Sequence, residues 1–129
     1  MPPQPLRRVC CVEDDEDIRR IVRLSLQKVG GMEVEMVGDP ALAIDRMIAF
    51  GPDLVILDWM MPVLDGPALF RRMRELPATR ALPVVFITAK ASQRELAELK
   101  ALGAAGAISK PFAPKELPDQ LRAIWRALP

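Results

Sequence analysis

The sequence predicts one α/β domain with a doubly wound, five-stranded parallel sheet in the strand order 2-1-3-4-5. Short apolar runs alternate with amphipathic segments along the chain, which is the pattern of repeated strand and helix units. Parallel strands need long right-handed crossovers, and helices on both faces of the sheet supply them. The chain has 129 residues, half of them hydrophobic, which is enough for one core and too little for a second domain.

The first unit is a strand at Val9 to Val12, followed by a helix that Asp15, Glu16 and Asp17 open. Asp15 and Asp17 are expected to cap the helix and to offset the positive end of its dipole. The helix is expected to end at Gly30-Gly31. Its core-facing positions follow helical spacing and are Ile18, Ile21, Val22, Leu26 and Val29.

The second unit pairs a strand at Val34 to Val37 with a helix that starts at Asp39-Pro40. The third begins with Leu54 to Leu57, an apolar run that ends at Asp58 and lies between two prolines, as expected of a strand buried on both faces. Its helix starts at Asp65-Gly66-Pro67, where Asp65 is expected to be a cap or turn residue. The core-facing positions of these two helices are Ala41, Ile44, Met47 and Ile48, then Leu69, Phe70, Met73 and Leu76.

The last two units have the same order of strand and helix. The fourth strand is expected at Pro83 to Thr88, the fourth helix at Ser92 to Leu102 and the fifth strand at Gly106 to Ser109. Pro118 has no N–H, so the last helix is expected to begin there, after a tighter turn over residues 114–117. The apolar positions of these helices are Leu96, Leu99 and Leu102, then Leu117, Leu121, Ile124, Trp125 and Leu128.

Composition excludes several classes of protein. Lys and Arg number 18 against 17 Asp and Glu, so a net charge of +1 does not favour general binding to nucleic acid or anionic membranes. No apolar run could cross a bilayer and no signal peptide is recognisable, so we expect a cytoplasmic protein without membrane insertion, with residues 1–7 as an N-terminal extension of a domain over residues 8–129. The chain has no histidine, which excludes histidine-based catalysis, histidine metal ligation and its own phosphohistidine. Adjacent Cys10 and Cys11 point to opposite faces of their strand and are expected to be buried thiols.

Polar residues lie where four predicted strands end. Glu13 and Asp14 follow the first strand, and Asp58, Thr88 and Lys110 lie at the ends of the third, fourth and fifth. The carboxyl ends of parallel strands share one edge of the sheet, so we expect these side chains to meet there, with Asp58 facing solvent. Clustered carboxylates raise one another's pKa values or hold a divalent cation, and oxygen ligands without His or thiolate select Mg²⁺ or Mn²⁺. Thr88 and Lys110 supply the hydrogen-bond donor and the positive charge that a phosphoryl group needs.

Each of these residues also has an ordinary structural interpretation. A lone Asp at a strand end is usually a cap or turn residue, Thr88 alone is a common strand residue, and Lys110 alone is a solvated lysine. A functional site is favoured because chemically complementary residue types occupy four strand ends of one sheet.

Four short motifs occupy this same edge, namely Val12-Glu13-Asp14-Asp15, Leu57 to Pro62 with Asp65-Gly66, Ile87-Thr88-Ala89, and Ser109 to Phe112. Each is weak alone, but together they resemble the receiver domain of the bacterial two-component response regulators, over roughly Arg8 to Leu128. The chain is similar to the stand-alone, chemotaxis-type members of that family. The resemblance implies the flavodoxin-like receiver fold.

By this resemblance, Asp58 accepts a phosphoryl group from a phosphohistidine on a sensor histidine kinase or a histidine phosphotransfer protein. Thr88 and Lys110 bind phosphoryl oxygens, and a cis peptide is expected at Lys110-Pro111. The implied ligands of Mg²⁺ are Asp14, Asp58, the backbone carbonyl of Met60 and, largely through water, Glu13. The chain would then be no enzyme toward other substrates, because it catalyses only its own phosphorylation and slow dephosphorylation.

The resemblance also implies a signalling output. The acyl phosphate pulls Thr88 inward and changes the surface of the fourth helix, fifth strand and fifth helix, which a downstream protein target reads. Many receivers use an aromatic ring on the fifth strand for this change, but the matching residue here is Ala107. We therefore expect movement of the loop around residues 89–94, or a partner's side chain, to fill the space at Ala107. Trp59, next to the acceptor, is expected to report Mg²⁺ binding by fluorescence, with Trp125 as background.

Two other classes of protein share part of this pattern. A flavodoxin-like binding protein has the same sheet, but Glu13-Asp14-Asp15 would repel a phosphate from the loop after its first strand. An aspartyl-phosphate phosphohydrolase of the haloacid-dehalogenase type needs a second Asp two residues after the nucleophile, where this chain has Met60.

The output of the chain has two interpretations. No basic or helix-turn-helix segment follows the last helix, so the main expectation is a stand-alone receiver that acts through protein contact without binding nucleic acid directly. The alternative is a receiver fragment of a longer response regulator or hybrid kinase whose output module is absent.

Overall fold

The computed structural model describes residues 4–89 and 92–129. Within them, parallel strands form a five-stranded sheet in the order β2-β1-β3-β4-β5, which confirms the predicted topology. The strands are β1 (Arg8–Val12), β2 (Glu33–Val37), β3 (Leu54–Asp58), β4 (Val84–Thr88) and β5 (Gly106–Ser109). The helices are α1 (Glu16–Leu24), α2 (Ala43–Phe50), α3 (Gly66–Glu75), α4 (Gln93–Ala101) and α5 (Leu117–Arg126), with a π-helical segment η1 (Ser25–Val29) and a 3₁₀ segment η2 (Pro40–Leu42).

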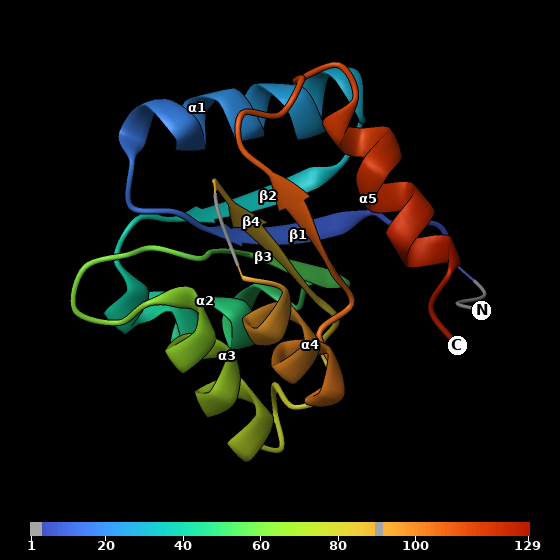
Figure 1. The fold of residues 1–129 in the computed structure, drawn as a ribbon. Coiled ribbons are helices and arrows are strands. Elements are labelled where there is room, and N and C mark those ends of the chain that lie inside the picture. The colour runs from blue at the N-terminus through green and yellow to red at the C-terminus, as the bar shows by residue number, and fades with distance from the viewer. Residues whose placement is uncertain (1–3, 90–91) are drawn as a thin grey trace.

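Helices cover both faces of the sheet, with α1 and α5 on one face and α2, α3 and α4 on the other (Figure 1). Neighbouring residues of a strand point to opposite faces, so Cys10 joins the core under α2 to α4 and Cys11 joins the core under α1 and α5. Both cysteines are free and buried, as predicted. Burial raises the pKa of Cys10 to about 12 and that of Cys11 well above its usual value, which keeps these thiols protonated at neutral pH.

The strand register brings the predicted polar residues to one edge of the sheet. All residues of β3 are buried, and this strand pairs with β1 and β4. Val12 lies opposite Leu57, and Asp58 lies opposite Ile87, one residue before Thr88. The residues that follow β1 and the last residues of β3 and β4 therefore arrive together at the carboxyl edge.

Capping residues fix where the helices begin. The side chains of Asp15, Asp65 and Ser92 accept hydrogen bonds from backbone N–H groups in the first turns of α1, α3 and α4, which confirms Asp15 and Asp65 as caps. α5 begins at Leu117, one residue earlier than predicted, with Pro118 in its first turn. The missing N–H of Pro118 removes no helical hydrogen bond in that position.

The first helix departs from its predicted pattern, because Ile21 and Val29 are 42% and 55% exposed. The buried side of this helix is formed by Val22, Ser25 and Leu26, to one side of Ile21. From Ser25 the helix widens to π geometry, and the backbone N–H of Gly30 donates to the carbonyl of Ser25, five residues back, at 3.0 Å. The wider turn moves Val29 away from the core-facing side.

Three positions in the second and third helices also differ from the prediction. Ala41 and Ile48 are exposed because the 3₁₀ segment η2 replaces the first turn of the expected helix and changes which residues face the sheet. Leu76 is 38% exposed because it lies just beyond α3 in an extended conformation.

The described start of the chain, from residue 4, and its C-terminus lie near each other, at the end of the sheet away from its carboxyl edge (Figure 1). Residues 4–7 of the predicted extension contact the domain: Leu6 is buried, and the backbone carbonyl of Gln4 accepts a hydrogen bond from Trp125 Nε1 at 2.8 Å. Among the helices that the structure describes, none has the length and apolar character needed to cross a membrane.

Gly66 contacts β3 so closely that a side chain would not fit, since a Cβ atom there would lie 2.3 Å from the backbone oxygen of Asp58. We expect Gly66→Ala to lower the free energy of unfolding in urea by about 3 kcal/mol, because the backbone must shift to relieve the overlap. Gly106→Ala is the matched control. Its Cβ would lie 3.3 Å from Ile124 Cδ1, the end of a flexible side chain, and a loss below about 1 kcal/mol is expected. Equal losses in the two variants would contradict this prediction.

Candidate functional site

The site begins with Glu13 and Asp14, directly after β1. The backbone N–H of Glu13 donates to the carbonyl of Val37 at 3.0 Å and continues the pairing with β2. Arg19 on α1 donates to the backbone carbonyls of Glu13 and Asp14 at 2.8 and 2.9 Å, which fixes the turn between strand and helix. The Glu13 carboxyl is buried, and Asp14 is exposed.

Asp58, at the end of β3, does not face solvent as predicted, because the residue is only 4% exposed. The chain after it is held by two backbone bonds, from Trp59 to Ile87 at 2.9 Å and from Gly66 to Trp59 at 3.1 Å. Lys110 reaches its carboxylate from β5. The loop after β3 and Lys110 together cover the Asp58 side chain, which the sequence pattern predicted to be open to solvent.

Lys110 joins the ends of three strands. Its Nζ lies 3.0 Å from Asp58 Oδ1 and 3.1 Å from Glu13 Oε1. The lysine side chain is 19% exposed and the two carboxylates are 3–5% exposed, so the contacts are shielded from water. Ion pairs in such surroundings are stronger than surface pairs, and loss of one partner leaves a buried charge unpaired.

The pKa of Glu13 departs from its ordinary value. Burial of Glu13, with the adjacent Asp58 carboxyl adding to it, raises the pKa of Glu13 to about 7. Burial alone would lower the pKa of Lys110, but its hydrogen bonds to Asp58 and Glu13 and the charges of these groups outweigh burial, and the net pKa is raised. Lys110 is therefore a firmly charged ammonium group, and Glu13 titrates near neutral pH.

Three carboxylates converge at this point. Oxygen atoms of Glu13, Asp14 and Asp58 all lie within 4.8 Å of one another. Hard oxygen donors without His or thiolate suit Mg²⁺ or Mn²⁺, and a cation would offset the repulsion between these neighbouring carboxylates. The residues present therefore fit a small divalent cation, with the exposed Asp14 on the open side.

Thr88 and Lys110 complete the edge. Thr88 ends β4, is 7% exposed, and its backbone carbonyl accepts the N–H of Lys110 at 2.9 Å. The peptide bond between Lys110 and Pro111 is cis, as predicted. A hydroxyl and an ammonium group thus lie at strand ends on one side of Asp58, and carboxylates from the end of β1 lie on the other.

The comparison with family models decides the identity of the fold. The model of the response regulator receiver domain matches residues 9–122. The chain belongs to this family. It is therefore a two-component signalling domain and not an enzyme of the usual kind.

Named relatives agree with the family assignment. The receiver is 34% identical over 122 residues to the phosphate regulon transcriptional regulatory protein PhoB of Escherichia coli K12, covering 95% of the chain and 53% of the relative. The PhoB of Rhizobium meliloti is 37% identical over 123 residues, with 94% and 53% covered. The chain thus spans about half the length of these curated relatives.

Solved structures show the same architecture. The chemotaxis protein CheY4 of Vibrio cholerae superposes with a TM-score of 0.84 at 31% identity, covering 92% of this chain and 98% of that one. A putative response regulator of Chloroflexus aurantiacus superposes with a TM-score of 0.81 at 28% identity, with 95% and 99% covered. These matches favour a receiver over the flavodoxin-like binding protein and the phosphohydrolase that the sequence left open.

Sequence reasoning missed three features of the receiver's site. Arg19 fixes the turn that carries two of the carboxylates, and no sequence signal marks an arginine for this role. Gly66 could have been recognised from the Asp65-Gly66-Pro67 turn as a place of close backbone approach. Val63 has a positive φ of 69° and a fully exposed side chain, an unusual conformation for a β-branched residue.

The Met60 side chain is 75% exposed on the same loop. A cavity of about 420 Å³ is lined by residues that follow β1, β2 and β3, including Asp14 and Val63, and by Arg72 of α3. It opens next to Asp14, so the carboxylate cluster is reachable from solvent on this side.

The raised pKa of Glu13 predicts a pH dependence of stability in metal-free protein. Between the ordinary pKa of 4.5 and about 7, the folded state keeps a proton that the unfolded state has lost, so the contribution of Glu13 to the free energy of unfolding falls as pH rises through this interval. We expect urea denaturation in EDTA to show that wild type loses stability relative to Glu13→Gln by on the order of 2 kcal/mol from pH 4.5 to 7. A difference between the two proteins that does not change with pH would contradict the prediction.

Proposed function

We propose that Asp58 is the phosphoacceptor of a histidine-to-aspartate phosphorelay and takes its phosphoryl group from a phosphohistidine on a sensor histidine kinase or a histidine phosphotransfer protein. One observation carries this proposal: Asp58 shares the Lys110 ammonium with Glu13 and lies within 4.8 Å of the Asp14 carboxylate cluster. The phosphohistidine must lie outside these 129 residues, because they include no histidine.

The proposed cation ligands are Asp14, Asp58, the backbone carbonyl of Met60 and, largely through water, Glu13. When bound, Mg²⁺ supplies positive charge that offsets the repulsion between a carboxylate and a phosphoryl group and orients its oxygens. The exposure of Asp14 supports this assignment, because a cation there keeps coordination positions open to an incoming ligand.

The transfer itself is a nucleophilic displacement. A carboxylate oxygen of Asp58 forms a bond to phosphorus, the P–N bond of the partner's phosphohistidine breaks, and the imidazole nitrogen keeps the electron pair. Lys110 turns from the carboxylates toward a phosphoryl oxygen as negative charge arrives there, and the Thr88 hydroxyl donates a hydrogen bond to another. The residues supply position and electrostatic stabilisation.

The same site explains why the chain is expected to hold its phosphoryl group. Hydrolysis of an acyl phosphate needs a group that positions or deprotonates water, and the residue two positions after Asp58 is Met60, whose thioether cannot accept a proton in this range. We infer slow self-catalysed dephosphorylation and no turnover of other phosphoesters.

The output surface of the receiver is proposed to be formed by α4, β5 and α5. Ala107 on β5 is exposed and lines a cavity of about 510 Å³ together with Phe112 and Ile124. We propose that a partner's side chain or the loop at residues 89–94 fills this space after phosphorylation; residues 90 and 91 of that loop lie outside the described residues. The output is a downstream protein target, without direct nucleic-acid contact by the receiver over residues 8–129.

The relatives leave the full protein open to two proposals. The PhoB proteins are named as transcriptional regulators and are about twice as long as this chain. A stand-alone signalling receiver remains the main proposal. The second is the receiver portion of a longer response regulator or hybrid kinase.

Incubation with Mg²⁺ and acetyl phosphate tests the phosphoacceptor directly. Intact-mass spectrometry is expected to show one added phosphoryl group on wild type and none on Asp58→Asn, because the amide is a far weaker nucleophile than the carboxylate. Asp53→Asn is the matched control. Asp53 lies just before β3, at the opposite end of the strand, and binds the backbone N–H groups of Arg7 and Arg8, so this variant is expected to be phosphorylated. Full phosphorylation of Asp58→Asn would sink the proposal.

Trp59 should report cation binding in the Trp125→Phe background, which leaves it as the one tryptophan of the chain. Its buried ring packs edge-on against Phe86 with centroids 5.2 Å apart, directly after Asp58, so a cation at the carboxylates changes its surroundings. We expect a saturable fluorescence change on Mg²⁺ titration and at least about tenfold weaker binding in Asp14→Asn. Equal affinity in the two proteins would remove Asp14 from the ligand set.

A further inference from the structure

Ser25 is a buried hydroxyl residue where the first helix meets the loop before α5. It begins the π-helical segment η1, is 1% exposed, and its Oγ donates a hydrogen bond to the backbone carbonyl of Pro114. The two residues are 89 positions apart in the sequence, so this bond ties the end of α1 to the loop between β5 and α5. That loop begins with Lys110.

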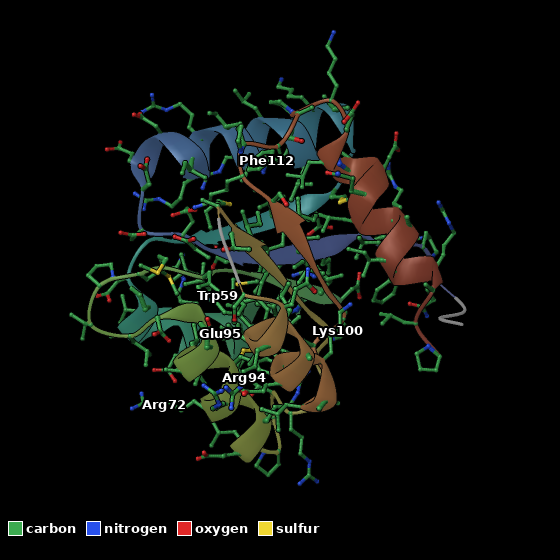
Figure 2. All side chains as sticks on the ribbon, viewed as in Figure 1. Trp59, Arg72, Arg94, Glu95, Lys100 and Phe112 are labelled. Carbon is green, nitrogen blue, oxygen red and sulfur yellow. The ribbon has the colours of Figure 1, made fainter. Side chains whose placement is uncertain are left out.

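Two residues of this loop cannot donate a backbone hydrogen bond that would hold it in place. Pro111 and Pro114 have no N–H to donate, and their rings fix the backbone φ angle. At its start, the N–H of Lys110 donates to the carbonyl of Thr88, and in between, Phe112 packs against the core beneath α1 (Figure 2). The Ser25 hydroxyl anchors the other end, only four residues after the lysine.

The π-helical segment η1 lies where the first helix meets the loop and α5. The π turn aligns Ser25 with Gly30, and Gly30 then meets α5: a Cβ on Gly30 would lie 3.0 Å from Pro118 Cβ, and its backbone carbonyl accepts a hydrogen bond from Arg122. In Figure 1 the loop after β5 rises over the sheet to this end of the first helix. Three contacts therefore join the first helix to the loop and to α5: the hydroxyl of Ser25, the guanidinium of Arg122 and the close approach of Gly30.

We propose that Ser25 is a positioning residue for phosphorylation, acting through Lys110. By fixing the carbonyl of Pro114, its hydroxyl holds the short, proline-restricted segment that carries the lysine, and so keeps the ammonium group 3.0–3.1 Å from both carboxylates. This role rests on the proposed function of Asp58. A residue at the C-terminal end of the first helix, remote from the carboxylates, would then influence the rate of phosphorylation.

Ser25→Ala tests the proposal with acetyl phosphate and Mg²⁺, using intact mass to follow phosphoryl uptake at a temperature at which circular dichroism shows each variant to be folded. We expect uptake to slow about fivefold to tenfold, because small displacements of a charge-stabilising group reduce transfer rates steeply. The Mg²⁺ affinity reported by Trp59 is expected to change by less than about twofold, since the ammonium group is displaced slightly and not removed, and no ligand is altered. Ser25→Thr keeps the hydroxyl and should restore most of the rate.

Thr79→Val is the matched control. Thr79 is also fully buried, and its hydroxyl donates to the backbone carbonyl of Met73 at 2.8 Å, in the turn between α3 and β4. Both substitutions remove a buried hydroxyl and should lower the unfolding midpoint by a similar amount, about 3–5 °C. Only Ser25→Ala should slow phosphorylation, so equal slowing in both variants would assign the effect to lost stability and overturn the proposal.

A double-mutant cycle with Lys110→Gln decides whether the effect passes through the lysine. If it does, adding Ser25→Ala to Lys110→Gln changes the rate by less than about twofold. A full fivefold to tenfold further loss in the double variant, or an unchanged rate in Ser25→Ala alone, would overturn the positioning role. Absence of any phosphoryl uptake in wild type would instead contradict the proposed function of Asp58, so the two failures are distinguishable.

Discussion

One ammonium group governs the arrangement of the site. Lys110 Nζ contacts Asp58 and Glu13, two buried carboxylates from different strands whose repulsion would otherwise oppose this packing. Its single positive charge faces three converging carboxylates, and burial of Glu13, with the neighbouring Asp58 adding to it, raises the pKa of Glu13. The carboxyl edge of the sheet is therefore suited to binding a cation in the unphosphorylated state. When a phosphoryl group arrives, Lys110 can turn toward its negative charge.

The rest of the fold serves to hold that lysine and its partners in place. The parallel register brings β1, β3 and β4 to one edge, Arg19 fixes the turn that carries two carboxylates, and Gly66 lets the following loop lie against Asp58. The first helix contacts parts of the site from both of its ends. Its start orders the turn after β1, and the widened segment at its other end seats the loop after β5 through Ser25. Phosphorylation chemistry and the proposed output surface share this loop, because Ala107 and Phe112 lie on either side of Lys110.

Sequence patterns predicted the topology and the caps at Asp15 and Asp65, because these depend on local residue types and on the rules for parallel sheets. The cis peptide at Lys110-Pro111 was expected from the family resemblance. The patterns also named the residues that the structure brings to the carboxyl edge. They failed where a property depends on contacts from distant parts of the chain. The buried Asp58 pairs with a lysine 52 residues away, and the π turn lies where Gly30 packs on α5.

The most direct test of this charge balance is the affinity for Mg²⁺ in Lys110→Met, measured by isothermal titration calorimetry. Removing the ammonium group leaves the carboxylates uncompensated, so Mg²⁺ is expected to bind at least about tenfold more tightly than in wild type, even though phosphorylation slows. Lys115→Met, which removes an exposed lysine from the same loop, should leave the affinity unchanged. Mg²⁺ binding that is equal or weaker in Lys110→Met would contradict the view that one ammonium group balances the carboxylates of this site.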